Sequence, residues 1–599
     1  MPDPVAAPRP FEEASRRRLA VARGDAPADL LLTGARVTDV FEASFFEADV
    51  AIVDGVIAGV GRYTDAEQTV DLEGAVLAPG LIDAHMHVES TMLRPSAFAP
   101  LALAHGTTGA VFDPHEIANV LGIEGMRWIM ADAAAAPGRW MFALSSCVPA
   151  SPHETSGARL EAEDLAPMFD DEAVVALAEM MNFPGLVAGD PGLLAKLRLG
   201  LERRGVVDGH APGVSGRMLQ AYAGVGVSSD HECTTADEAR EKLRAGQMIF
   251  IREGSAARNL EALAPTVTES NWTRFGFCTD DRHPQDLAEH GHIDHVLRRA
   301  VQMGMPPARA IAMATQTTAQ HYGLTKPSTH RPALGAVAPG YAADLVVFDA
   351  PETLNVQSVW GGGEDVEALA GSSRAADAER PTPPQFAASV HLPVGFGKAS
   401  LAVPACAKIR VIGLRPGQLL TDHLILQPQL EDGYCVADVS RDLMKLAVIE
   451  RHGRSAAGDP GLGVGFVQGF GLRAGALGST VGHDSHNVTV VGASDSDMVL
   501  AARTLEGLGG GVCAVLDGEV LAVLSLPIAG LMADVPAQDV VEGYRAVLAA
   551  ADRLSAGPGD PFMPLSFCPL TVIPHLKLGD RGLVDVDRFA RVSLAAEPS

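Results

Sequence analysis

The chain has 599 residues, which is too long for one ordinary domain, and its 47% hydrophobic content excludes global disorder. Asp and Glu number 74 against 46 Lys and Arg, so the formal net charge is −28, which argues against binding nucleic acid or an anionic membrane. The seven cysteines are scattered and contain no C-x-x-C pair. This pattern argues against a disulfide scaffold or a cysteine-rich zinc site and is typical of a cytoplasmic protein. We find no apolar run of about 18 residues that predicts a membrane span.

Residues 29–80 contain short runs typical of β-strands. Residues 334–349 show the same pattern of aliphatic residues interrupted by glycine. We predict that residues 1–78 and 333–360 both contribute to one small β-sandwich domain. This domain would flank a central domain that lies between the two segments.

Eight apolar runs alternate with helix-like runs over the central residues 79–332. The predicted strands are 79–87, 107–114, 140–148, 173–180, 206–210, 226–231, 247–253 and 275–280. Their spacing leaves room for a helix and two loops after each strand, which predicts an α/β fold of the TIM-like (β/α)8 type. A doubly wound open sheet is disfavoured, because no glycine-rich phosphate loop follows the first strand.

Residues 361–389 are rich in Gly, Ala and Pro and predict a linker. The remaining residues 390–599 predict a C-terminal α/β domain. Its predicted strands lie near 419–428, 444–451, 487–493 and 511–526, and its predicted amphipathic helices are 496–508 and 537–554.

Two histidines end the first predicted barrel strand. His85 and His87 are two residues apart, so both side chains point to one face, at the strand end where barrel active sites lie. Four other strands end in residues of the same chemical kind: Glu179, His210, His231 and Asp280. Imidazole and carboxylate ligands suit Zn, Mn or Fe. Six ligands, with one carboxylate bridging, are enough for two metals that activate a shared water.

The sequence resembles the amidohydrolase superfamily. The resemblance rests on these strand-end residues and on two segments, PGLIDAHMHVE (79–89) and GAVAPGYAADLVVFD (335–349). Within that superfamily the chain is similar to the bacterial adenine deaminases. The more specific matching segments are VFDPHEIANVLG (111–122), IREGSAARNL (251–260) and GHDSHNVTVVG (482–492). The resemblance covers nearly the whole chain.

The resemblance implies that His85 and His87 bind one metal, and that His210 and His231 bind the other. Glu179 takes the place where many relatives carry a carboxylated lysine that bridges the metals. The metals would be Mn or Fe, with Zn as a further possibility, and two per subunit are expected.

Asp280 would bind metal and also act as the general base, taking the proton of the attacking water and passing a proton to the leaving ammonia. Attack at C6 of adenine also requires a proton at N1. The sequence does not decide which residue donates this proton; the candidates are Glu116, His115 and Glu253.

Other polar residues near the strand ends are expected to contact the substrate. Asp281 follows the metal-binding aspartate, at the position where related barrel deaminases hold N7 of the purine. Arg252 and Ser255 would contact the ring or orient ligands, and a buried ion pair is the alternative for Arg252. Asp113 is either a substrate contact or a turn and helix-cap residue.

The patch around His483 and His486 in the second domain is expected to lie in or over the active site, with a domain or subunit interface as the alternative. The leading hypothesis is hydrolytic deamination of adenine to hypoxanthine and ammonia, in purine salvage, by a homodimer or higher homo-oligomer. The alternatives are deamination of another aminopurine, a cyclic-amide hydrolase and a metal-free scaffold. Glu179 counts against the cyclic-amide hydrolase, because those relatives commonly carry lysine there.

Overall fold

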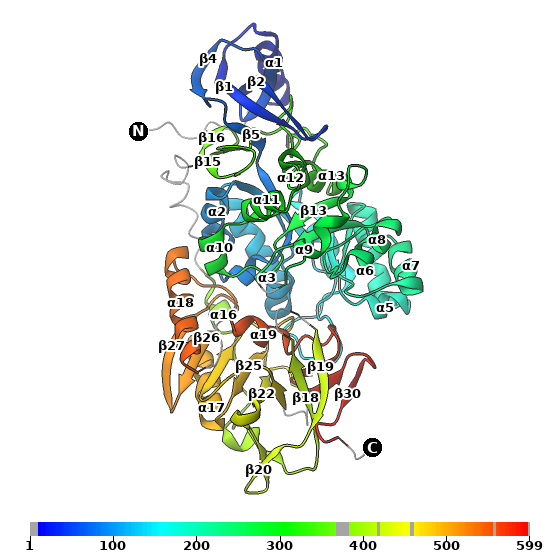
Figure 1. The fold of residues 1–599 in the computed structure, drawn as a ribbon, viewed down its shortest axis with the longest axis vertical. Helices are drawn as coiled ribbons and strands as arrows, with labels where there is room; N and C mark the ends of the chain where they lie inside the picture. The colour runs from blue at the N-terminus through cyan, green and yellow to red at the C-terminus, as the bar shows by residue number, and fades with distance from the viewer. Residues whose placement is uncertain are drawn as a thin grey trace.

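The computed structural model describes residues 10–255, 257–366, 382–415, 418, 420–455, 461–554 and 559–596. Figure 1 shows three units along the long axis: a small β-domain at one end, a barrel in the middle and the C-terminal domain at the other end. Among the described residues, no helix is both long and apolar enough to cross a membrane.

The small β-domain is built from two separate segments of the chain. Strands β1 (Ala28–Asp39), β2 (Ser44–Val53), β3 (Val56–Gly61), β4 (Ala66–Asp71) and β5 (Val76–Pro79) precede the barrel, and β14 (Leu345–Phe348), β15 (Val356–Gly361) and β16 (Glu364–Asp365) follow it. They form one sheet in the order β16-β15-β14-β5-β1-β2-β3, with β4 paired to β1. The antiparallel pairing of β5 with β14 joins the two flanks into one unit.

The central unit is a closed barrel of eight strands. These are β6 (Leu81–Met86), β7 (Thr107–Phe112), β8 (Arg139–Leu144), β9 (Val174–Met180), β10 (Val207–Gly209), β11 (Ser229–Asp230), β12 (Met248–Arg252) and β13 (Phe275–Cys278). Strands β6–β10 and β11–β13 form two parallel sheets. Backbone hydrogen bonds join the sheets, from Ser228 N to Val207 O at 2.8 Å and from Asp280 N to His85 O at 3.0 Å. The predicted (β/α)8 fold is therefore confirmed.

Helices cover the outside of the barrel, so almost every strand residue is buried, and this is why the strands appear as apolar runs in the sequence. The longer helices are α2 (Pro95–Ala104), α3 (His115–Ala135), α6 (Pro191–Arg203), α7 (Gly216–Gly224), α8 (Ala236–Arg244) and α11 (Ile293–Gln302). Helix α3 is kinked at Gly122, whose φ is 60°, and its first turn carries His115 and Glu116 to the barrel mouth.

The C-terminal domain contains an eight-stranded mixed sheet in the order β19-β18-β23-β22-β25-β24-β26-β27. Its strands are β18 (Ile409–Leu414), β19 (Thr421–Leu426), β22 (Leu443–Ile449), β23 (Leu462–Gln468), β24 (Ala476–Ser479), β25 (Val488–Gly492), β26 (Gly511–Leu516) and β27 (Glu519–Ser525). The domain also contains helices α17 (Asp495–Leu508), α18 (Ala537–Leu554) and α19 (Phe562–Phe567). Two small sheets complete it: β17 (Val403–Pro404), β21 (Tyr434–Val436) and β20 (Gln429–Glu431) form one, and β28 (Leu576–Gly579), β29 (Gly582–Asp585) and β30 (Ala590–Val592) form the other. Of the predicted linker, residues 367–381 lie outside the described residues, and residues 384–387 form the short helix α16 (Pro384–Ala387).

A half-buried histidine, His452, contacts the loop after β24 where the C-terminal domain meets the barrel. His452 Nε2 donates to Ser485 O at 2.8 Å. Burial, with the charge of Arg451 as the next cause, lowers the pKa of His452 to about 3. An unfolded histidine titrates near pH 6.5, so between about pH 6.5 and 3 the unfolded chain binds more protons than the folded chain. The contribution of His452 to stability is therefore lost progressively as the pH falls through this window.

We predict that replacing His452 with Gln, whose amide keeps a donor for Ser485, makes the thermal stability less dependent on pH between about pH 6.5 and 4.5. Thermal melts of both proteins over a pH series measure this. Melting temperatures that fall in parallel in the two proteins would show that the titration of His452 contributes nothing.

Candidate active site at the barrel mouth

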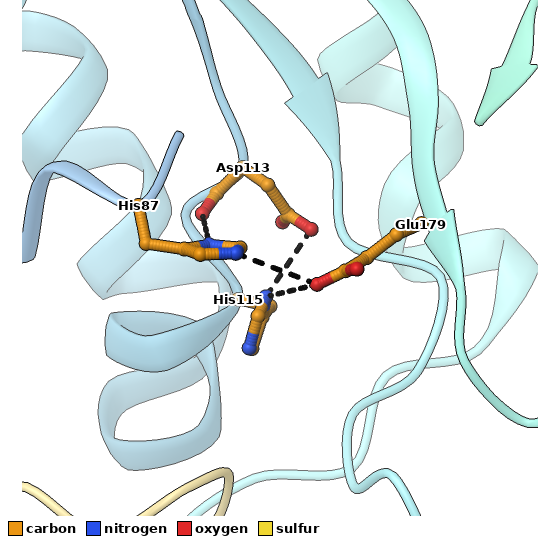
Figure 2. Close-up of side chains that lie close together, drawn as sticks. All are labelled: His87, Asp113, His115 and Glu179. Carbon is orange, nitrogen blue, oxygen red and sulfur yellow. Dashed lines mark hydrogen bonds and ion pairs between the residues drawn. The ribbon is translucent and has the colours of Figure 1, made fainter. Parts of the chain in front are cut away.

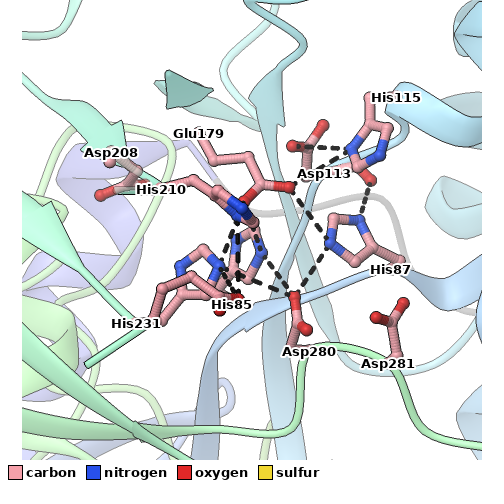
Figure 3. A network of polar contacts seen from close by, with 12 residues as sticks. His85, His87, Asp113, His115, Glu179, Asp208, His210, His231, Asp280 and Asp281 are labelled. Carbon is pink, nitrogen blue, oxygen red and sulfur yellow. Dashed lines mark hydrogen bonds and ion pairs between the residues drawn. The ribbon is translucent and has the colours of Figure 1, made fainter. Parts of the chain in front are cut away.

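Six predicted metal ligands lie together at the carboxyl ends of the barrel strands, and all are buried (Figure 3). They come from the ends of five strands, which the closed barrel brings to one mouth. The six residues are His85, His87, Glu179, His210, His231 and Asp280.

Glu179, on β9, lies between two pairs of histidines. Its Oε2 is 2.6 Å from His210 Nδ1 and 3.1 Å from His231 Nε2. Its Oε1 is 3.5 Å from His87 Nε2. Burial raises the pKa of Glu179, but the charges and hydrogen bonds of His210 and His231 outweigh this effect and hold the pKa well below its usual range. The ionised carboxylate therefore contacts His87 through one oxygen and His210 and His231 through the other.

Asp280 follows β13, the strand next to β6, and contacts the first pair of histidines. Its Oδ1 lies 3.1 Å from His85 Nε2 and 3.0 Å from His87 Nε2, and its Oδ2 is paired with the guanidinium of Arg252. The backbone φ of Asp280 is 57°, in the left-handed region that few non-glycine residues adopt. Such strained residues cluster at functional sites, which agrees with a reactive role for this carboxylate.

The polar atoms of this cluster fit a bound cation. His85, His231 and Asp280 can each bring one ligand atom within 4.8 Å of the others, and so can Glu179, His210 and His231. Buried polar groups are normally paired, yet the Nε2 atom of His210 has no hydrogen-bond partner among the described residues. Imidazole and carboxylate donors without thiolates suit a divalent transition metal in a catalytic site.

Asp113, at the end of β7, orients two histidines of the site (Figure 2). Its backbone carbonyl is 3.0 Å from His87 Nδ1, which leaves Nε2 directed at the carboxylates. Its side chain lies 3.2 Å from His115 Nδ1 and accepts from Ser145 Oγ at 3.1 Å. Both carboxylate oxygens therefore contact other groups of the site wall, and Asp113 is not part of the cavity lining given below.

Arg252, at the end of β12, is a buried cation among three carboxylates. It is paired with Glu232, Asp280 and Asp281, the last at 3.2 Å. Asp281 also accepts from Ser90 Oγ at 2.7 Å. Arg252 and Asp281 therefore both lie at the site, and the ion pair considered from the sequence forms with these residues.

Of the three proton donors considered, Glu116 and His115 lie near the site and Glu253 does not. Glu116 accepts from Ser90 Oγ at 3.0 Å, and burial, with the charge of Glu89 as the next cause, raises its pKa well above the usual range. Glu253 instead pairs with Arg299 and accepts from Leu260 N at 3.1 Å.

Ser255 is also directed away from the centre. Its hydroxyl bonds to Asp286 at 2.5 Å and accepts from His283 N at 2.8 Å. Ser255 is not part of the lining of the cavity described next, so the expected contact with the ring is not favoured.

A cavity lies over these groups, and the C-terminal domain contributes part of its wall. His483, whose ring stacks on Phe567 with centroids 4.6 Å apart, is part of its wall, as expected for a covering residue. His486 lies behind this wall, where its Nδ1 accepts from Gly482 N at 3.2 Å. The complete lining is His87, His115, Glu179, Met181, His210, Glu232, Arg252, Asp280, Asp281, His483, Asp484, Phe567, Leu570 and Ile573.

Glu232 and three apolar side chains of the C-terminal domain line the cavity but were not predicted from the sequence. Glu232 directly follows a predicted ligand in SSDHECT, and this adjacency could have identified it. The apolar wall of Phe567, Leu570 and Ile573 carries no such signal, because only the docking of the two domains brings it to the barrel.

Comparison with known proteins agrees with this arrangement. Residues 76–374 match the model of the Amidohydrolase family, and residues 418–590 match the Adenine deaminase C-terminal domain. The chain is 45% identical over 577 residues to an adenine deaminase of Desulfatibacillum aliphaticivorans, covering 96% of this chain and 99% of the relative. It is 44% identical over 580 residues to an adenine deaminase of Methanothrix thermoacetophila, covering 97% and 99%.

Among solved structures, an N-acetyl-D-glucosamine-6-phosphate deacetylase from Mycobacterium smegmatis aligns with 56% of this chain and 99% of its own, at 18% identity and a TM-score of 0.43. The two family models and the near full-length identity to the relatives decide the assignment. The chain belongs to the adenine deaminases of the amidohydrolase family.

Proposed function

We propose that this chain hydrolyses adenine to hypoxanthine and ammonia, as an enzyme of purine salvage. The observation that carries the proposal is the buried cluster of four histidines and two carboxylates at the barrel mouth, facing a cavity to whose wall the C-terminal domain contributes. The relatives that match 96% and 97% of this chain bear the name adenine deaminase.

The cluster would hold two divalent transition metals per subunit, Mn or Fe, with Zn as a further possibility. When bound, such metals lower the pKa of water, so that hydroxide is available near neutral pH. One side of the site consists of His85 and His87 and the other of His210 and His231, with the carboxylates of Glu179 and Asp280 between them.

Asp280 acts as the general base. It takes the proton of the water that attacks C6 of adenine and passes a proton to the departing ammonia. The ion pair with Arg252 holds the carboxylate in place during both transfers.

Glu116 supplies the proton that N1 requires. Burial raises its pKa, which keeps the carboxyl group protonated and therefore able to donate. His483 Nδ1 lies 3.4 Å from Glu116 Oε1, and His483 lines the cavity, so it can pass the proton to the ring. His115, which also lines the cavity, is the second choice of donor.

A panel of substrates tests this proposal against the alternatives. The metal-supplied protein is incubated separately with adenine, 2,6-diaminopurine, hydantoin and dihydrouracil. We expect equal amounts of ammonia and hypoxanthine from adenine, and intact rings in the two cyclic amides. Ring opening of a cyclic amide without release of ammonia from adenine would favour the cyclic-amide hydrolase, and faster release from diaminopurine would reassign the substrate.

We also propose that the enzyme works in the cytoplasm as a homodimer or higher homo-oligomer. All seven cysteines are free, which supports a reducing compartment. Ile425 and Val523 are 54% and 38% exposed on the edge strands β19 and β27, which supports pairing between subunits. Light scattering coupled to size-exclusion chromatography measures the oligomeric state.

A further inference from the structure

Asp484 is a carboxylate in the cavity wall to which the steps above give no role. It lies in the loop between β24 and β25 of the C-terminal domain and is 2% exposed. Its Oδ1 is 3.5 Å from His115 Nε2 and 3.8 Å from His483 Nδ1. Its Oδ2 has no hydrogen-bond partner among the described residues. A buried carboxylate oxygen without a donor is unfavourable, so this part of the cavity fits a ligand that brings its own N–H or O–H group.

The ring of His115 separates Asp484 from the hydrolytic centre. His115 Nδ1 lies 3.6 Å from Glu179 Oε1, whereas the opposite nitrogen of the same ring faces Asp484. Asp484 therefore contacts the edge of the His115 ring that is turned away from Glu179. Adenine with C6 at Asp280 would meet Asp484 only if its five-membered ring points toward the C-terminal domain.

We propose that Asp484 accepts the N9–H of free adenine and thereby selects the free base over nucleosides and other N9-substituted purines. This inference rests on the proposed function. The five-membered ring of adenine carries a single N–H donor, and a ribose or alkyl group at N9 replaces it. The Oδ2 atom would then stay without a donor in the cavity.

The neighbouring wall strengthens this selection. Besides His483 and Asp484, the C-terminal domain adds Phe567, Leu570 and Ile573 to the cavity lining, and these three side chains offer no hydrogen bond to a ribose. A site built to bond one N–H group discriminates strongly against an analogue that lacks it, because the buried partner is left unpaired.

The test compares two substrates in two enzymes. kcat/KM is measured for adenine and for 9-methyladenine with the metal-loaded wild type and with Asp484→Ala. We expect Asp484→Ala to lose about 10- to 100-fold on adenine, the range for a hydrogen bond to a charged group, with little change on 9-methyladenine. The preference for adenine should therefore fall by the same factor.

Asp580→Asn is the matched control. Asp580 is a buried carboxylate of the same domain and accepts from Thr155 N at 2.9 Å, but it is not part of the cavity lining. This variant should leave the preference for adenine over 9-methyladenine unchanged. Metal analysis of all proteins ensures that they are compared at equal occupancy.

If Asp484→Ala lowers kcat/KM equally for adenine and 9-methyladenine, the proposal is overturned. That result would show that Asp484 supports the site without accepting a hydrogen bond from N9–H. If Asp484→Ala does not fold, inhibition of the wild type decides instead: 9-methyladenine that binds as tightly as adenine would also overturn it. Failure of the wild type to release hypoxanthine from adenine is a separate outcome, which would reject the proposed function itself.

Discussion

Asp280→Asn is expected to lower kcat on adenine by about 10²- to 10⁴-fold, the usual contribution of a general base, while most of the metal stays bound. The amide keeps an oxygen at the position that faces His85 and His87, but it cannot accept a proton from the attacking water. Steady-state kinetics together with metal analysis of the same preparation measure both quantities.

Asp294→Asn provides the control for Asp280→Asn. Asp294 is a buried aspartate on α11 that contacts His105 and Arg298, outside the cavity lining. The control should keep wild-type kcat, since it changes no group at the cavity. A kcat of Asp280→Asn within a few-fold of wild type would remove Asp280 from its role as the base.

Glu179→Ala is expected to lose metal and activity together. The carboxylate contacts His87 through one oxygen and His210 and His231 through the other, so its removal takes an anionic ligand from both sides of the site. Loss of groups that only orient ligands already weakens metal binding by about 10- to 100-fold, so a larger loss of affinity is expected here. Metal content after dialysis and kcat/KM on adenine measure the effect.

Glu154→Gln is the matched control for Glu179→Ala. Glu154 is a buried glutamate that contacts Thr571, outside the lining of the cavity. Its replacement should leave metal content and turnover at wild-type values. Full metal occupancy in Glu179→Ala would contradict the bridging position of this carboxylate.

The barrel could be predicted from sequence because its strands are buried on both faces and stand out as apolar runs. The strands of the C-terminal sheet are harder to predict from the sequence, because some of them contain glycines, which are typical of turns. In β23, a Cβ on Gly463 would lie 2.0 Å from Gly579 O, so the close packing of β28 requires glycine there. Such a requirement becomes visible only once the partner strand is known.

The six predicted ligands could be found because each ends a barrel strand. Glu253 was placed incorrectly among the proton donors for a simple reason: successive strand residues point to opposite faces. Arg252 points into the site, and Glu253 therefore points outward, to Arg299. Asp484 belongs to the polar patch around His483 and His486 that was expected at the active site. Phe567, in contrast, reaches the cavity only through the docking of the C-terminal domain, which no local pattern specifies.

The most direct test of the account is the release of hypoxanthine from adenine as a function of bound metal. Metal-free protein is reloaded separately with Mn, Fe or Zn, and activity is plotted against metal per chain. We predict no release without metal, and activity that reaches its maximum as occupancy approaches two per chain. Full activity in the metal-free protein, or no release of hypoxanthine at two metals per chain with any of the three, would contradict the account.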